Sequence, residues 1–293
     1  DSVSLFGDNT VTTLAGDFDG GLVFRNNAPL TVGTVDGKQG IASGGDVVLI
    51  TDTLNIANAI AASGQTVTLQ TLTAARDVVL GAEDGAALSL TDQELDRISS
   101  ALIRIGSDDQ RAASITIAGD ITLGAGDTLS LRSEGNITGD SSIEVGKLAI
   151  RANGNVLNLA GQNSVLALAI QAPNALVPIF NNTVSADTTL SIDNIAGVAG
   201  IAITIFNAAS QGQASLSNVE IPLPRRYTVN FESGGVETVP TKVTPGSIWT
   251  SYLDVPFPTS DKADRAKRVE DASKFMSGSL TILGSTTGPQ TGR

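Results

Sequence analysis

Carboxylates and arginines gather in the middle of the chain, and these are the side chains that could carry out catalysis. Enzymes that cleave polysaccharides can use clustered carboxylates as general acid, general base or calcium ligands. The candidates here are Asp77, Glu83, Asp84, Arg104, Asp108, Asp109, Arg132 and Glu134. Most of the acids lie in Gly-Asp pairs or similar corners, where a turn explains them without catalysis. The sequence therefore assigns no catalytic residue.

The 293 residues include no cysteine and no histidine. This composition removes Cys- and His-based zinc sites and the nucleophile systems that depend on histidine. Asp17 and Asp19 in GDFDGG could offer oxygen ligands to calcium, but the further spaced ligands of an EF-hand loop are missing. A solvated turn is the preferred interpretation there, and also at Asp108 and Asp109. We expect no metal site, no cofactor and no enzymatic activity.

The net charge of −12 and the pI near 4.3 argue against nucleic-acid binding, which draws on Lys and Arg to neutralise phosphates. The sequence has no apolar run of about 18 residues, so we expect no membrane-spanning helix. The N-terminal DSVSLFGDNTV lacks the basic and apolar regions of a signal peptide. If the chain is exported, its signal has been removed or the chain is one segment of a longer precursor.

Short aliphatic runs alternate with Gly-Asp and Gly-Asn pairs, most clearly in AGDITLGAGDTLSL (118–131). Because Gly, Asn and Asp tolerate positive φ or bond their own backbone, each pair marks a corner between short strands. The pattern predicts an all-β fold, a parallel β-solenoid over residues 1–221 with coils of about 20 residues. Aromatic residues make up only 4%, so the core must be narrow and aliphatic. Inward-facing positions are expected at Ile121, Leu123, Leu129, Leu131, Ile143, Val145, Leu148 and Ile150.

One segment breaks this pattern. In LTDQELDRISSALIRIG, Thr91 lies three residues before Glu94, which is the spacing of a capping box. We predict a short helical decoration near 92–100, before LIRI (102–105) returns to a strand.

The sequence also contains a longer repeat, which spans many of the 20-residue coils. NTVTTLA (9–15) matches NSVLALA (163–169), LVFRNN (22–27) matches LVPIFNN (176–182), and LTVGTVDGKQGI (30–41) matches LSIDNIAGVAGI (190–201). The offset between matching blocks drifts from 154 to 160 residues. The chain is predicted to complete one super-repeat near residue 160 and to begin a second.

Composition changes after residue 221: six of the ten prolines fall in 222–258, as do the only Trp and both Tyr. Since proline cannot donate to an interior ladder, we expect residues 222–293 to leave the solenoid as a capping or subunit-contact region. Within it, 260–276 has the spacing of an amphipathic helix, and SLTIL (279–283) reads as a strand. The candidate subunit contacts are Tyr227, Phe231, Trp249, Tyr252, Phe257 and Phe275.

Three stretches carry a family resemblance: GDITLGAGDTLSLRSEGNITG (119–139), LTDQELDRISSALIRIGS (90–107) and PLTVGTVDGKQGI (29–41). Over about residues 9–221 the chain resembles bacterial filamentous-haemagglutinin-like large exoproteins. The resemblance implies a right-handed parallel β-helix, two-partner secretion, and roles in adhesion, biofilm matrix or contact-dependent competition.

These features together predict an extracellular structural or adhesive rod of a bacterial surface or matrix, self-assembling head to tail into filaments through the C-terminal region. A monomeric adhesin stalk that binds a glycan or a host protein is the first alternative. A β-helix polysaccharide lyase or hydrolase is the second.

Overall fold

The structure is a computed structural model. It describes residues 1–200 apart from 75, 110, 176–178 and 184–188. Beyond residue 200 it describes the strand segments 201–207, 210–216, 219–222, 227–232, 237–238 and 276–285.

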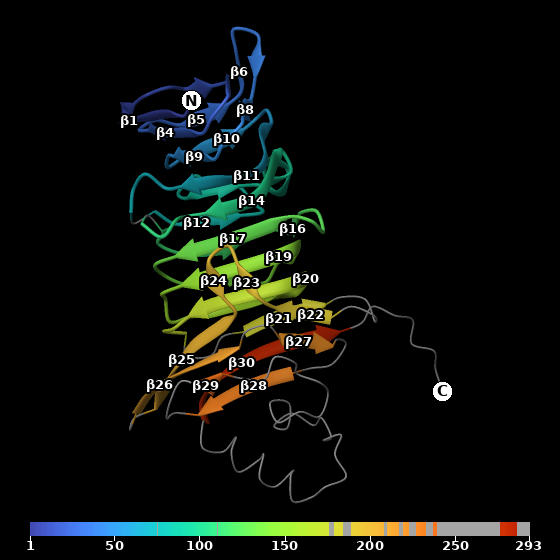
Figure 1. Ribbon diagram of the computed structural model, residues 1–293. Coiled ribbons are helices and arrows are strands. Elements are labelled where there is room, and N and C mark those ends of the chain that lie inside the picture. The colour runs from blue at the N-terminus through green and yellow to red at the C-terminus, as the bar shows by residue number, and fades with distance from the viewer. Residues whose placement is uncertain are drawn as a thin grey trace, which may run out of the picture.

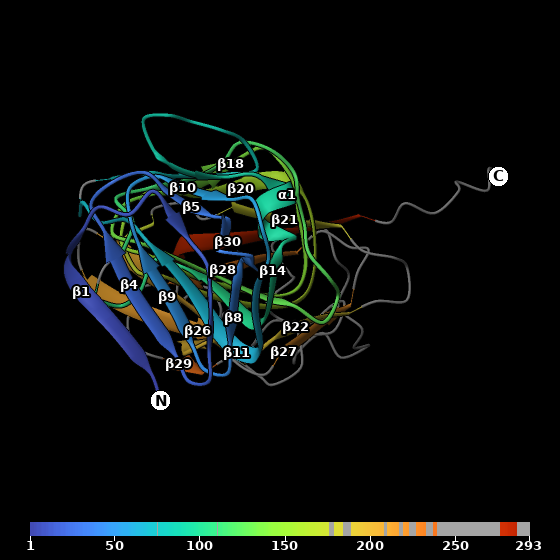
Figure 2. The ribbon, with the colours of Figure 1, turned by 90° about the horizontal axis from the view of Figure 1, so that it is seen from above.

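The chain winds into a parallel β-helix, so the predicted fold class is confirmed (Figure 1). Coils stack along one axis and pair through parallel backbone hydrogen bonds. Leu129 pairs with Leu148 and Leu148 with Leu168, so a coil takes 19 or 20 residues there. Viewed from above, strands of successive coils overlie one another around a common interior (Figure 2).

Three ladders of strands form the wall of the β-helix. The first contains β1 (Val3–Asn9), β4 (Leu22–Asn26), β9 (Val47–Ile50), β11 (Ile60–Gln70), β14 (Ile98–Ile105), β17 (Thr128–Ser133), β19 (Ile143–Ala152) and β20 (Leu157–Ala172). The second contains β3 (Gly16–Phe18), β8 (Ile41–Ser43), the first residues of β11 and β14, and β16 (Ile121–Thr122) with the first residues of β19. The third begins with β2 (Thr13–Leu14), β5 (Leu30–Val32) and β10 (Leu54–Ile56). It resumes with β13 (Leu88–Leu90), β12 (Val78–Leu80), β15 (Ile115–Ile117), β18 (Ile137–Gly139), the first residues of β20, β21 (Ile179–Thr183) and β30 (Met276–Ser285).

Aliphatic side chains from all three ladders fill one continuous core. The eight positions predicted to face inward are all buried. Alternation places every second side chain of a strand inside, and stacking aligns these side chains between coils.

The corners are held by side chains that reach from one coil to the next. Asp46, Asp120 and Asn136 each accept a backbone N–H from a residue 20 to 22 positions later, at 2.8 to 3.0 Å. The glycine before each of them is explained by close approach and not by a positive φ. A Cβ on Gly119, for example, would lie 2.3 Å from the Gly81 carbonyl oxygen of the neighbouring coil.

Helix α1 (Asp92–Leu95) begins at the predicted capping box, because Thr91 accepts from the Glu94 N–H and Glu94 accepts from the Thr91 N–H. The helix is shorter than predicted, since β14 already starts at Ile98. It also does more than decorate the surface: Leu95 is part of the core. The third ladder is interrupted between β10 and β13, and α1 lies beside this break.

The predicted super-repeat is present in the strand pairing. Leu5 pairs with Phe24 and Asn9 with Asn26, just as Leu159 pairs with Phe180 and Asn163 with Asn182. Both pairings contain the same register shift. The hairpin of β6 (Thr34–Val35) and β7 (Lys38–Gln39) likewise recurs as that of β23 (Asn194–Ile195) and β24 (Val198–Ala199). In both hairpins the two turn residues have positive φ.

Antiparallel pairs appear among the strands after residue 188. β22 (Thr189–Ile192) pairs with β27 (Val219–Pro222), β25 (Ile201–Asn207) with β26 (Ser210–Leu216), and β28 (Tyr227–Glu232) with β30. β29 (Glu237–Thr238) pairs with β26 in parallel. The predicted strand at 279–283 lies within β30.

Other C-terminal predictions fall outside the described residues. One is the helix predicted at 260–276, of which only the last residue, Met276, is described, as the first residue of β30. The others are the candidate contacts Trp249, Tyr252, Phe257 and Phe275. Tyr227 and Phe231 belong to β28, of which only the strand is described. In the described part of the chain, no helix has the length and apolar character needed to cross a membrane.

Candidate functional site

Three of the predicted catalytic candidates, Arg104, Asp108 and Arg132, lie close together on the outside of the first ladder. Arg151, which the sequence analysis did not single out, lies beside them. Arg132 pairs with Arg151 on the next coil, and Arg151 with Gln171 on the one after. Arg104 lies one coil earlier, close enough to Arg132 for the two charges to interact. We call Arg104, Arg132 and Arg151 the arginine column. The signal for Arg151 was its spacing, since it follows Arg132 by one coil.

Two segments cross this column from outside. Asp108, on the loop after β14, accepts hydrogen bonds from both Arg132 and Arg151. The β23–β24 hairpin folds back over β19 and β20 (Figure 1). Arg132 donates a hydrogen bond to the carbonyl oxygen of Ala196 in this hairpin at 2.5 Å, and Arg151 donates one to the carbonyl oxygen of Gly197 at 3.3 Å.

The hairpin also packs on a second, smaller apolar cluster. Ile195 and Val198 are buried against Ala149 and Ala169, which face outward from β19 and β20. Alanine leaves room for the hairpin to approach the sheet closely. Arg132, Arg151 and the alanine pair therefore hold the hairpin against the sheet together.

The column favours the charged form of Asp108, whereas burial disfavours the charge on Arg104. Partial burial alone would raise the pKa of Asp108, but the hydrogen bonds and charges of Arg132 and Arg151 outweigh it, and the pKa is lowered. Burial, followed by repulsion from Arg132, lowers the pKa of Arg104. The Arg104 Nε is buried, and no described residue accepts from it.

This arrangement suits positioning better than proton transfer. A carboxylate held in its charged form by two guanidinium groups is a poor general acid. Arg132 is only 3% exposed, so the hairpin and the loop cover its guanidinium.

The remaining predicted acids do not join the column. Glu134 pairs with Arg111 at 2.8 Å. Glu83 accepts from the Ser89 hydroxyl, and Asp84 accepts the Ala86 N–H within a turn. Asp77 and Asp109 are exposed.

The calcium candidates Asp17 and Asp19 both lie on the surface. Asp17 forms an ion pair with Lys38, and Asp19 is exposed. Among the described residues, no three acidic side chains come together as a group that could hold a metal ion.

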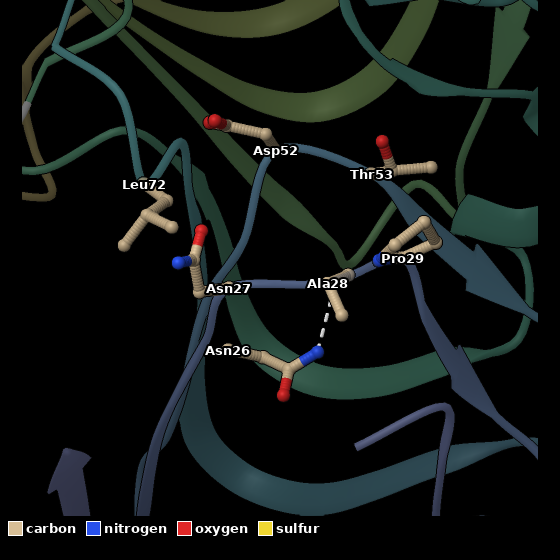
Figure 3. A pocket seen from close by; sticks show the side chains of 7 residues that line it. All are labelled: Asn26, Asn27, Ala28, Pro29, Asp52, Thr53 and Leu72. Carbon is tan, nitrogen blue, oxygen red and sulfur yellow. Dashed lines mark hydrogen bonds between the residues drawn. The ribbon is translucent and has the colours of Figure 1, made fainter. Parts of the chain in front are cut away.

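A shallow groove of about 180 Å³ lies at a corner of the N-terminal coils (Figure 3). It is lined by Asn26, Asn27, Ala28, Pro29, Asp52, Thr53 and Leu72. Much of its polar capacity is used within the chain: Asn26 donates to Ala28 O, and Asp52 accepts from the N–H and hydroxyl of Thr73. Pockets for small ligands are usually larger, from about 300 Å³.

Three of the exposed large hydrophobic side chains among the described residues lie in the N-terminal rung, residues 3–11. Its side chains Leu5, Phe6 and Val11 are 45%, 61% and 37% exposed. The core lies directly behind, because Leu22 and Phe24 of the next rung are buried. Within the described residues, β1 pairs with β4 alone, so one edge of β1 is unpaired. Sequence reasoning missed this surface, since an exposed rung has the same pattern as a buried one.

Comparison with known proteins gives no match: no family model, no curated protein and no solved structure is similar to this chain at a significant level.

Proposed function

We propose that the chain is a structural rod of a bacterial surface or extracellular matrix that assembles end to end. The observation that supports this most is the regular stack of coils, in which parallel ladders pair coil to coil along one axis and corner side chains bind the next coil. Because each coil contacts only its neighbours, such a body lengthens as a rod. The segment 222–258, with its distinct proline-rich and aromatic composition, is suited to contacting the next subunit.

The composition supports an extracellular setting. An acidic chain without cysteine can cross an envelope unfolded without being trapped by disulfides. The resemblance to filamentous-haemagglutinin-like exoproteins points the same way. Tyr227, Phe231, Trp249, Tyr252, Phe257 and Phe275 remain the proposed subunit contacts.

Negative-stain microscopy of the purified full chain, at several concentrations, tests the assembly. Filaments or chains of rods whose length grows with concentration are the expected result. Single rods at every concentration would contradict it. Single rods that bind on a glycan array or to host protein would instead favour the monomeric adhesin stalk.

A further inference from the structure

Two strands of the third ladder stand in reverse order along the axis of the β-helix. In the sequence β12 precedes β13, but in the structure β13 comes first: it contacts β10 on one side and pairs with β12 on the other. The far side of β12 then pairs with β15. After β11 the chain therefore passes over one level of the ladder, and β13 returns to fill it.

The backbone hydrogen bonds record this reversal. Where coils follow one another in order, the first residue of a third-ladder strand donates its N–H to the following coil, as Ile115 does to Asn136 O at 2.9 Å. Leu88, the first residue of β13, donates instead to Asp77 O at 2.9 Å, which lies earlier in the sequence. Relative to β13, β12 therefore takes the place of the following coil.

The residue that follows each strand shows the same reversal. Ala118, after β15, donates its N–H to Leu80 O of the preceding coil at 2.8 Å. Gly81, after β12, donates to Leu90 O at 2.8 Å, although Leu90 lies later in the sequence. The reversed strands pack as well as the ordered ones, since Leu80, Leu88 and Leu90 are fully buried in the core. The reversal therefore belongs to the packed body of the β-helix.

Side chains tie the two sides of the reversed pair together. In β10, the N–H of Ile56 donates to Glu94 Oε1 and its carbonyl oxygen accepts from Arg97, both at 2.9 Å. Arg76, just before β12, donates to the carbonyl oxygen of Ala87, just before β13, at 3.1 Å. Each of these bonds joins a residue before the middle of loop 81–87 to a residue after it.

From this order we infer that β12 and β13 interlock the two parts of the chain that loop 81–87 joins, so that the β-helix cannot unwind past them one coil at a time. A coil at the end of a solenoid is held by one neighbour. β12 is held on both sides by strands that follow it, β13 and β15, and must be drawn out from between them. Unwinding from the other end meets the same obstacle, since β13 lies between β10 and β12, which both precede it.

The chain also contains a regular boundary that serves as a control. The parts before and after Gly126 meet at one interface, where β14, β15 and β16 pair with β17, β18 and β19. Among the described strands, none that precedes Gly126 lies between two strands that follow it. Gly85, in the middle of loop 81–87, and Gly126 are both exposed, and a Cβ on either would meet nothing within 4 Å. The same insertion therefore fits at both glycines.

Cleavage of the folded chain at these two glycines tests the interlock. A protease recognition site is inserted at Gly85 in one variant and at Gly126 in the matched control, and each full chain is cut after it has folded. Size-exclusion chromatography follows the separation of the two pieces at the lowest urea concentration that separates the control. We expect the half-life of the chain cut at Gly85 to be at least about tenfold longer, because β12 must leave both β13 and β15.

A ratio of the two half-lives below about ten would overturn the inference. Should the insertion at Gly85 prevent folding, an insertion after Glu83 in the same exposed loop gives an equivalent cut. Leu88→Ala, combined with each cut, should speed separation at Gly85 alone, because β12 and β13 stay in one piece after cleavage at Gly126. Equal effects of Leu88→Ala on both cut chains would also overturn the inference. None of these results depends on whether the chain forms filaments.

Discussion

Asn9 and Asn163 stand 154 residues apart in the sequence and make the same three hydrogen bonds through Nδ2. Each closes a bulge in its strand, because it donates to the carbonyls two and four residues earlier. Each also reaches the following rung. The two differ in burial, since Asn163 is fully buried and Asn9 is partly exposed.

Because of this difference in burial, a change to alanine should lower the free energy of unfolding more at Asn163 than at Asn9. Asn163→Ala leaves the Ile143 N–H and several carbonyls without partners in the core, so we expect a loss of about 2 to 4 kcal/mol in the free energy of unfolding. Asn9→Ala is the matched control, and water can replace its bonds, so the loss should stay below about 1.5 kcal/mol. Urea denaturation measures both. Similar losses would mean that the burial of Asn163 is unimportant.

Two glycines should respond to alanine in opposite directions. At Gly119 a Cβ would lie 2.3 Å from the Gly81 carbonyl oxygen, so coils must move apart, at a cost of about 1 to 3 kcal/mol or more. A Cβ on Gly126 would meet nothing within 4 Å, and Gly126→Ala should stabilise by about 0.4 to 1 kcal/mol by restricting the unfolded chain. Thermal unfolding of the two variants gives the signs. A stabilising Gly119→Ala would show that the corners are not tightly stacked.

These glycines also show where sequence reasoning reaches its limit. The pairs Gly45-Asp46, Gly119-Asp120 and Gly135-Asn136 predicted corners correctly, because Asp and Asn are turn formers whatever lies around them. The prediction was wrong for Gly7-Asp8 and Gly16-Asp17, which lie within β1 and β3. The reason for the glycine was different from the expected one, since Gly119 meets the backbone of the coil containing Gly81. That contact depends on which coil stacks where, and local pattern does not contain it. The buried positions from Ile121 to Ile150 were predictable because alternation alone decides them.

The arginine column was likewise predictable from the sequence only in part. Arg104, Asp108 and Arg132 were candidates because of their residue types, but their meeting with Arg151 requires the register of three coils. The hairpin that covers Arg132 comes from 64 residues later in the chain. No local pattern predicts such a contact, whereas the super-repeat did match the two segments that contain the hairpins, 30–41 and 190–201.

Asp108 makes the stability of the chain depend on pH in a defined direction. Its pKa is lowered in the folded state, so its contribution is fully present above the unfolded value, about 3.9, and is lost as the pH falls through the folded pKa. Asp108→Asn should therefore be less stable than the unmodified chain at neutral pH, and the gap should close in acid below about pH 4.

Urea denaturation of both proteins between acid and neutral pH measures that gap. Asp109→Asn is the neighbouring control and should change the free energy of unfolding by less than about 0.5 kcal/mol at neutral pH, since Asp109 is exposed like Asp108 but forms no ion pair with a described arginine. A gap that is unchanged in acid would show that the bonds from Arg132 and Arg151 do not stabilise the charged form.

Helix α1 carries two carboxylates that accept N–H groups from different coils, and their surroundings predict different responses to amide substitution. Glu94 is buried and uses both oxygens: Oε1 accepts from Ile56 N–H at 2.9 Å, and Oε2 accepts from the N–H and hydroxyl of Thr91. Glu94→Gln forces an NH₂ group against a donor, so we expect a loss of about 1 to 3 kcal/mol. From the described residues, Asp92 accepts the Thr122 N–H through one oxygen, which Asn retains, so Asp92→Asn should change stability by less than about 0.5 kcal/mol. If urea denaturation gave the two variants equal midpoints, Glu94 would not be the residue that joins α1 to the coil of Ile56 across the break in the third ladder.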